Sequence, residues 1–334
     1  MQQPKFWGTA PGLTATLLGP AAALYGLGGR VRHALVNPTK ADVPVICIGN
    51  LIAGGAGKTP LALAVAARLV ARGIAPHFLS RGYRGSIRET HRVDPTRDTA
   101  AEVGDEPLLL AAQYPTWTGR DRAASAAAAV AAGAEALVMD DGFQNPSLVK
   151  DLSLIAIDAG FGHGNGRVIP AGPLREPLMR GFERADAAVL IGEPAPATAW
   201  PFVPEGIPLL QARITPRFTG LSLTGAPVLA FAGIGRPEKF FETLRRMGAR
   251  LVDTQAFPDH HTYSMVILAR LEARAHSQGA MLVTTEKDAV RLPRSFQGRA
   301  IAVPVSLGFE DPDALDTLLD TLFPREANTA VAQP

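Results

Sequence analysis

The glycine-rich segment GGAGKT at residues 54–59 constrains the fold of this chain more than any other part of its sequence. It follows an apolar, β-branched run at 43–48 and precedes a helical pattern from about 60 to 72. Consecutive glycines let backbone N–H groups surround phosphate oxygens, and the start of the helix adds positive charge. Lys58 of such a loop reaches the β- and γ-phosphates of a nucleotide. The sequence therefore predicts a strand, a phosphate-binding loop and a helix in succession.

The loop lacks one glycine of the usual pattern G-x-x-x-x-G-K-[ST], because Ile52 stands at the first glycine position. This departure argues against the commonest nucleotide-binding families. A metal-bound triphosphate also needs a carboxylate at the end of a nearby strand, and the apolar run 136–139 ends in Asp140 and Asp141. We expect Mg²⁺ to be held by the Thr59 hydroxyl and by this pair of aspartates. Which aspartate contacts the metal directly stays open.

Strand and helix patterns alternate along the chain, which is typical of a parallel sheet with helices on both faces. We therefore predict an α/β fold with a P-loop NTPase-like parallel sheet and a smaller C-terminal α/β domain. Expected strands lie at 43–48, 76–79, 136–139, 152–157, 187–191, 228–232, 250–257 and 281–284, and expected helices at 60–72, 123–136, 237–247 and 264–278. Expected domains are an N-terminal membrane-interface helix at 1–35, a P-loop kinase domain at 36–215, a smaller domain closing over the cleft at 220–325 and a frayed tail at 326–334.

Charge and cysteine content exclude several classes of protein. The 334 residues include 33 basic and 31 acidic side chains, for a net charge of +2. This basic excess is too small to indicate a nucleic-acid partner. A single cysteine, Cys47, lies in an apolar run, which excludes a disulfide framework and a cysteine-based zinc site. The sequence is thus typical of a reducing compartment.

The N-terminal segment at residues 6–29 has no charged side chain and is followed by basic residues at 30–33. Two prolines and six glycines within it argue against a membrane-spanning helix. Leucine and alanine recur at helical spacing from about 13 to 28. Two interpretations remain open: a helix that lies in the membrane interface, or a first helix packed on the domain's own sheet.

Three classes of phosphate-binding-loop protein compete. A GTPase should carry N-K-x-D or T-K-x-D on a later strand, but Lys287 and Asp288 are adjacent here. A partition-type ATPase would have a signature lysine where Ala53 stands. A phosphotransferase acting on a small acceptor is therefore favoured, and a nucleotide-switched ATPase acting through a protein partner is kept as the alternative.

Several motifs occur in a fixed order along the chain. They are VICIGNL at 45–51, AGGAGKTP at 53–60, SRGY at 80–83, VGDEP at 103–107, DDGFQ at 140–144, GNGR at 164–167, PAGPLREP at 170–177, FPDHH at 257–261 and TTEKDA at 284–289. In these motifs the chain resembles the tetraacyldisaccharide 4′-kinases of lipid A biosynthesis, from about residue 13 to 310. That family commonly lacks the glycine at the position of Ile52.

The resemblance implies ATP and Mg²⁺ as cofactors. It implies transfer of the γ-phosphoryl group to the 4′-hydroxyl of a tetraacyldisaccharide 1-phosphate, giving the 1,4′-bisphosphate lipid. The expected partners are this lipid and the membrane surface, through the N-terminal helix, at the cytoplasmic face of the inner membrane. No nucleic acid is expected, and a monomer is favoured although the sequence leaves the oligomeric state open.

The resemblance also implies roles for individual residues. Asp105 is the expected base and His260 its partner, with Lys58 clamping the γ-phosphate. The competing histidine is His261, but the family pattern has the histidine that directly follows Asp259. Because Asp105 and His260 belong to different expected domains, their pairing predicts a cleft that closes between domains.

Further residues are expected to contact the two substrates. Gln144 could contact the acceptor or a phosphate, but it is equally well explained as a loop glutamine whose hydrogen bonds are made within the protein. Tyr83 could contact a sugar ring or the 1-phosphate, but it could equally be an aromatic residue of a lid. The segment TTEKDAVRL at 284–292 is compatible with a nucleotide contact, an interdomain contact or a structural ion-pair cluster. The expected ATP-binding residues are Ile52, Ala53, Gly54, Gly55, Ala56, Gly57, Lys58 and Thr59, and the expected acceptor-binding residues are Tyr83, Arg120, Arg122, Gln144, Arg175 and Glu176.

Overall fold

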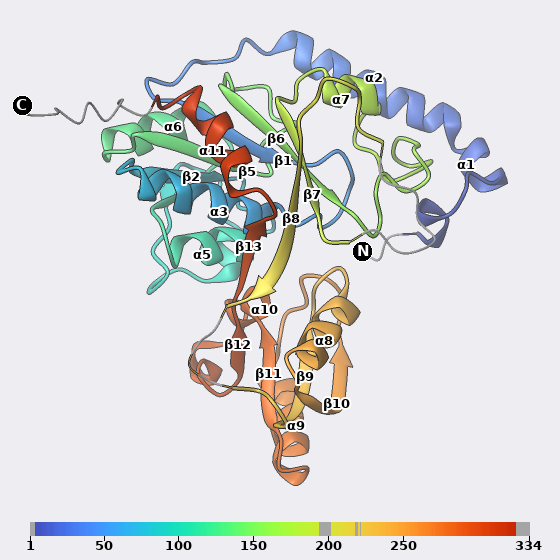
Figure 1. Ribbon diagram of the computed structural model, residues 1–334, viewed down its shortest axis with the longest axis vertical. Helices are drawn as coiled ribbons and strands as arrows, with labels where there is room; N and C mark the ends of the chain where they lie inside the picture. Colours follow the sequence, from blue (N-terminus) through green and yellow to red (C-terminus); the bar gives the residue numbers. More distant parts are fainter. Residues whose placement is uncertain (1–3, 194–201, 218–219, 221, 325–334) are drawn as a thin grey trace, which may run out of the picture.

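A computed structural model of the chain describes residues 4–193, 202–217, 220 and 222–324. Two sheets organise it (Figure 1). The nine-stranded sheet and its helices form the large unit. The four-stranded sheet and its helices, at residues 222–304, form the small unit, which lies below the large sheet in Figure 1. The expected fold class is thereby confirmed.

The large sheet is parallel except at its two edges, where β3 pairs with β4 and β13 with β8 in antiparallel fashion. The central strands are apolar and fully buried, as expected for strands covered by helices on both faces. In spatial order the strands are β13 (Val305–Phe309), β8 (Leu209–Pro216), β7 (Ala187–Ile191), β6 (Leu152–Asp158), β1 (Val45–Gly49), β5 (Ala136–Asp140), β2 (Pro76–Ser80), β4 (Thr116–Thr118) and β3 (His91–Arg92).

Two apolar cores cover the faces of the large sheet. On one face, leucines of α3 and α11, including Leu61, Leu69 and Leu315, pack against the strands. On the other face the core includes Phe143 and Phe182. The helices of the large unit are η1 (Lys5–Gly8), α1 (Leu13–Leu17), α2 (Gly19–Leu35), α3 (Lys58–Ala71), α4 (Ala100–Val103), α5 (Asp105–Ala111), α6 (Arg122–Ala131), α7 (Leu178–Phe182) and α11 (Pro312–Asp320).

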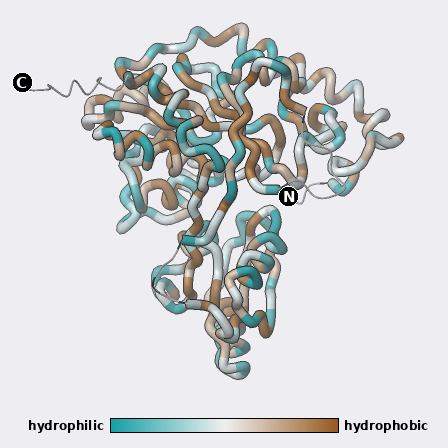
Figure 2. The backbone as a smooth tube through the Cα atoms, viewed as in Figure 1, coloured by the Kyte–Doolittle hydropathy of each residue, from teal (hydrophilic) through white to brown (hydrophobic). Residues whose placement is uncertain are grey.

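The small unit has a parallel sheet with its own core on each face. Phe240 and Phe241 pack on one face and Leu268 and Leu271 on the other. Figure 2 shows hydrophobic residues concentrated along the strands of both units. The strands of the small unit are β10 (Arg250–Ala256), β9 (Pro227–Ala232), β11 (Met281–Thr285) and β12 (Ile301–Val303). Its helices are α8 (Pro237–Arg246), α9 (Met265–Ser277), α10 (Glu286–Ala289) and η2 (Arg294–Phe296).

The expected extent of the smaller domain, 220–325, is wrong at its C-terminal end. The chain returns to the large sheet after β12, because β13 pairs with β8. Helix α11 then packs on α3, where Arg72 forms ion pairs with Asp316 at 3.0 Å and Asp320 at 2.8 Å. The expected frayed tail at 326–334 lies outside the described residues, and the other domain boundaries stay predictions.

The N-terminal helices α1 and α2 leave most of their leucines exposed. Only Ala15 and Ala22 are buried, whereas Leu13, Leu17 and Leu24 are 76, 72 and 70% exposed. This argues against the interpretation of a core-packed first helix. In Figure 1, α2 runs along the outer side of the large unit, away from the small unit. Within the described ranges, no helix combines the length and the apolar character that a membrane crossing requires.

Candidate active site

The phosphate-binding loop connects β1 to α3, as the sequence predicts. Gly57 precedes α3 with a positive φ of 80°. A Cβ atom at Gly57 would lie 2.8 Å from Cδ1 of Ile191, so both the backbone conformation and the close approach require glycine. The loop is thereby seated against the carboxyl end of β7.

Lys58 folds back over the loop. Its Nζ lies 3.3 Å from Oδ1 of Asn50, 3.4 Å from the carbonyl oxygen of Gly54 and 3.6 Å from Oδ1 of Asp141. Asn50 is fully buried and also donates to the Gly54 carbonyl at 3.0 Å. The ammonium group therefore lies at the mouth of the loop, held by groups that a phosphate can replace.

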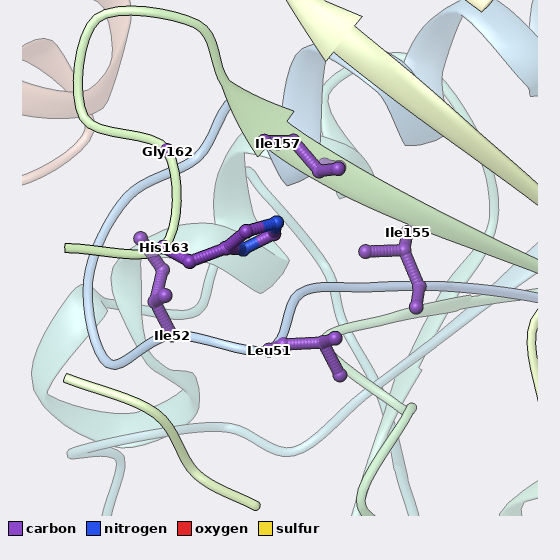
Figure 3. Close-up of a pocket in the computed structure, with 7 residues that line it drawn as sticks. Leu51, Ile52, Ile155, Ile157, Gly162 and His163 are labelled. Carbon is purple, nitrogen blue, oxygen red and sulfur yellow. The ribbon is translucent and has the colours of Figure 1, made fainter. Parts of the chain in front are cut away.

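Ile52 and Ala53 precede the glycines of the loop and contact the body of the large unit. The Ile52 side chain is 4% exposed and lines a cavity of about 10 Å³, at the lower limit for one water molecule. Figure 3 shows it beside His163, whose ring points into this cavity. The Ala53 amide donates to the carbonyl of Pro173 at 2.7 Å. The Ile52 side chain thus anchors the loop in the core. A nucleotide could contact this residue only through its backbone.

Asp140 ends β5, which is adjacent to β1 in the sheet. Its side chain is buried, and the Thr59 hydroxyl donates to Oδ2 at 2.9 Å. The other oxygen, Oδ1, is buried without a hydrogen-bond partner. Burial, followed by the charge of Glu106, raises the pKa of Asp140 to about 7. A buried carboxylate oxygen beside a hydroxyl is a donor pair suited to a hard divalent cation.

Asp141 has a different environment, although it is the next residue. It has a left-handed φ of 57°, and Arg175 donates to both of its carboxylate oxygens, at 3.0 and 3.3 Å. Burial favours the neutral form, but the charges of Lys58 and Arg175 outweigh it and hold the pKa of Asp141 at about 2. Asp141 is therefore an ionised partner of two cations.

The structure brings Asp105 and His260 together, as the sequence predicts. Asp105 begins α5, is 5% exposed and lies with its Oδ2 2.8 Å from Nδ1 of His260. Burial favours the neutral acid, but the hydrogen bond from His260 and the charges of Lys287, His260 and Arg291 lower the pKa of Asp105 to about 2. The carboxyl is thus ionised at neutral pH and faces a histidine from the small unit.

The two adjacent histidines point in different directions. His260 adopts a φ of 58° and also meets the Tyr83 ring edge-on, with the ring centroids 5.7 Å apart. His261 instead stacks on Phe257, with centroids 4.6 Å apart, and contacts Tyr263. The geometry therefore selects His260 as the partner of Asp105.

Three of the expected acceptor-binding residues form one network beside Asp141. Arg175 donates to Oε1 of Gln144 at 3.1 Å, and Gln144 donates to Oε1 of Glu176 at 3.3 Å. Gln144 also donates to the Asn50 carbonyl at 2.9 Å, so it is a satisfied loop glutamine in this structure. Glu176 is paired with Arg184.

The remaining acceptor candidates are dispersed. Tyr83 is 51% exposed next to His260. Arg122 begins α6 and is buried; burial and the charge of Arg81 lower its pKa to about 10. Arg120 is exposed, and within the described part of the chain its side chain forms no hydrogen bond or ion pair with the residues above.

The sequence indicates no role for Asn50 and leaves several roles open for the segment 284–292. The structure shows this segment as both an ion-pair cluster and a contact between the units. Nζ of Lys287 lies 3.1 Å from Oε1 of Glu106, and Nε of Arg291 lies 3.4 Å from Oδ2 of Asp105. Two signals in the sequence could have identified them. Asn50 is a polar residue directly after the strand β1, and the charged run at 286–288 directly follows the strand β11.

Comparisons with known proteins identify the family of the chain. A family profile described as tetraacyldisaccharide-1-P 4′-kinase matches residues 14–324. Proteins named tetraacyldisaccharide 4′-kinase from Gluconacetobacter diazotrophicus and Dinoroseobacter shibae are 53 and 51% identical, over 96 and 97% of this chain and 98% of each relative. A crystal structure of LpxK from Aquifex aeolicus, in complex with ATP, has a TM-score of 0.75 and 27% identity, covering 93% of this chain and 100% of that one. The chain therefore belongs to the tetraacyldisaccharide 4′-kinase family.

Proposed function

We propose that this kinase transfers the γ-phosphoryl group of ATP to the 4′-hydroxyl of a tetraacyldisaccharide 1-phosphate. The observation that carries the proposal is the Asp105–His260 pair, joined at 2.8 Å, in a chain whose phosphate-binding loop places Thr59 on Asp140 and Lys58 beside Asp141. The comparisons give no support to the alternative, a partition-type ATPase.

The residues present fit a nucleotide-borne Mg²⁺. The Thr59 hydroxyl and Oδ1 of Asp140 would hold the ion, since Oδ1 is buried and unpartnered whereas Asp141 is occupied by Lys58 and Arg175. The described ranges contain no cluster of three metal-ligating side chains. This agrees with a cation whose other ligands are phosphate oxygens and water. When bound, Mg²⁺ neutralises charge that develops on the β- and γ-phosphates.

Asp105 would orient the acceptor hydroxyl and accept its proton. Its Oδ2 faces His260, while Oδ1 accepts the Glu106 amide at 3.1 Å and no second donor from the described residues, which leaves a lone pair for the hydroxyl. Phosphoryl transfer proceeds through a loose transition state, so a weak base that positions the nucleophile suffices. His260 would stabilise the carboxylate and share the proton as it leaves.

The acceptor would contact the residues around this pair. Arg175, Gln144 and Glu176 are already linked beside Asp141, and Arg175 supplies a guanidinium suited to bidentate binding of a phosphate. Tyr83 would pack on a sugar ring next to His260. Arg122 and Arg120 are proposed contacts for the acceptor's 1-phosphate.

The proposed reaction is tested directly with labelled ATP and a tetraacyldisaccharide 1-phosphate in detergent with Mg²⁺. We expect a bisphosphorylated lipid whose formation stops with EDTA and resumes when Mg²⁺ is added back. ADP release without a labelled lipid would contradict the proposal, and would instead be the behaviour of an ATPase.

The exposed leucines of α1 and α2 support a further part of the proposal. A helix with exposed apolar side chains, ending in Arg32 and His33, is suited to lie in a membrane interface with anionic lipids. We propose that the enzyme binds the cytoplasmic face of the inner membrane peripherally in this way, because its acceptor is a membrane lipid.

Replacing Leu13, Leu17 and Leu24 by serine should release the protein from vesicles. Each leucine that enters the membrane interface contributes about 2 kcal/mol, so loss of all three, about 6 kcal/mol, should weaken binding by about 10⁴-fold. Co-sedimentation with vesicles that contain anionic lipid measures this. Val266→Ser, at an exposed position on α9 in the small unit, is the control and should bind like the unmodified protein. Equal sedimentation of the triple variant would contradict the membrane proposal.

A further inference from the structure

The segment that follows β11 connects to both members of the Asp105–His260 pair. Figure 1 places α10 at the junction of the two units. Arg291, just beyond α10, has a nearly buried side chain that is 6% exposed. Its Nε donates to the carbonyl of Lys287 at 2.9 Å and lies 3.4 Å from Oδ2 of Asp105, the same oxygen that faces His260. Arg291 thus reaches the proposed base from the small unit.

Arg291 also holds the turn that carries His260. One guanidinium nitrogen donates to the carbonyl of Gly233 at 3.0 Å and to that of His261 at 3.3 Å. The backbone N–H of His260 donates to the same Gly233 carbonyl at 3.1 Å. Because His260 has a left-handed φ of 58°, its position depends on these contacts rather than on a regular element.

The guanidinium is itself anchored. Arg291 lies 3.2 Å from Oδ1 of Asp288, a fully buried carboxylate. Asp288 also accepts the Tyr263 hydroxyl at 2.6 Å, the Gly233 amide at 2.9 Å and the Thr285 hydroxyl at 2.6 Å. A buried carboxylate with this many donors is fixed, so it fixes the arginine in turn.

Lys287 makes a parallel contact from the same segment. Its Nζ lies 3.1 Å from Oε1 of Glu106 and 4.0 Å from Oδ2 of Asp105. The charged groups that face Asp105 are therefore His260, Lys287 and Arg291, with Asp259 3.7 Å from the far side of the His260 ring. The first helical turn of α5 is thus held from the small unit by two cations.

We infer that Arg291 is a positioning residue for phosphoryl transfer, which orients the Asp105 carboxylate and the His260 turn as one rigid assembly, with Lys287 supporting it through Glu106. The inference rests on the proposed function, since it assigns this arginine to the reaction that Asp105 and His260 would perform. Arg291 combines a charge 3.4 Å from the Asp105 carboxylate with hydrogen bonds from one nitrogen to two backbone carbonyls, so lysine should replace it only in part.

Removal of the Arg291 charge should change the pKa of Asp105 in a predictable direction. A cation beside Asp105 favours the ionised form, so its loss raises the pKa of that carboxyl. As the pH is lowered, activity that needs the ionised carboxylate should therefore decline at a higher pH in the variant than in the unmodified enzyme. A merely structural arginine would change stability without moving this limb of the pH profile.

The test compares Arg291→Gln and Arg291→Lys in two backgrounds, the unmodified enzyme and Asp105→Asn. In the unmodified background we expect Arg291→Gln to lower kcat by about 30-fold with the KM for ATP within about twofold, and Arg291→Lys to recover part of the loss. The acidic limb of kcat should move to higher pH. In the Asp105→Asn background the same substitution should change kcat by less than about twofold, because its target is gone.

The matched control is Arg299→Gln, which removes an exposed arginine of the small unit that pairs with Glu272. It should leave kcat and the pH profile unchanged. Equal effects of Arg291→Gln in both backgrounds, or an unmoved acidic limb, would overturn the inference. A fully active Asp105→Asn enzyme would instead overturn the proposed base, and the inference with it.

Arg291→Gln removes a nearly buried charge that pairs with Asp288, so a second variant covers the case in which it does not fold. Lys287→Met changes a side chain that is 25% exposed. It should lower kcat by about tenfold and move the acidic limb in the same direction. Unchanged kcat and pH profile in folded Lys287→Met would overturn the inference.

Discussion

Asp105→Ala and His260→Ala are each expected to lower kcat by roughly 10²-fold or more, and the double variant should be little worse than either alone. The two side chains share one hydrogen bond of 2.8 Å between the units, so each substitution removes the function of both. The comparison of kcat for the two single variants and the double variant, at saturating ATP and lipid, measures this.

His261→Ala is the matched control for the histidine pair. Its ring packs against Phe257 and Tyr263, so alanine should lower the free energy of unfolding through lost packing. The kcat of the folded fraction should stay within about twofold of the unmodified enzyme. If His261→Ala abolishes activity while His260→Ala is silent, the choice of histidine is wrong.

Much of the large sheet could be predicted because its signals are local. The strands β1 and β5 are continuous apolar runs, and each is followed by the polar residues that define the site. By contrast, β8 alternates exposed and buried positions only from Leu209 to Ala212, and its next three residues are exposed. Its partner β13 comes some 90 residues later in the chain, in the antiparallel pair of Val305 with Pro216. Such pairing carries no signal in a local window of sequence.

The two aspartates after β5 show a second limit of the sequence. Both are carboxylates at a strand end, yet burial raises the pKa of Asp140 to about 7, whereas cations hold that of Asp141 at about 2 despite burial. The difference depends on Lys58 and on Arg175, which is 34 positions further along the chain. Adjacent identical residues therefore have roles that only the folded structure separates.

The contact of Arg291 with Asp105 is a third feature that the sequence alone does not reveal. The motif around Lys287 was recognisable, but its partners lie more than 180 positions earlier in the chain. Only the docking of the small unit on α5 joins them. The charged segment can therefore be recognised in the sequence, whereas its contact with Asp105 depends on the tertiary arrangement.

Lys58→Met should lower kcat by about 10³-fold and weaken ATP binding. The ammonium lies at the mouth of the loop on Asn50, Gly54 and Asp141, from where it can move to the γ-phosphate. Methionine preserves the length of the side chain but removes the charge that stabilises phosphoryl transfer. Arginine at this position should not restore the rate, because a planar guanidinium differs from a compact ammonium.

The fold should tolerate this change, because Asp141 keeps its bidentate contact with Arg175 when Lys58 is lost. Thermal unfolding of Lys58→Met should therefore stay close to that of the unmodified protein, which separates a catalytic defect from misfolding. Lys40→Met is the control: its side chain is 74% exposed and lies 3.9 Å from Asp151, where a surface pair contributes about 0–1 kcal/mol. Its kcat should be unchanged. If Lys58→Met retains more than about a tenth of the activity, another cation must neutralise the γ-phosphate, and Arg175 is then the first residue to test.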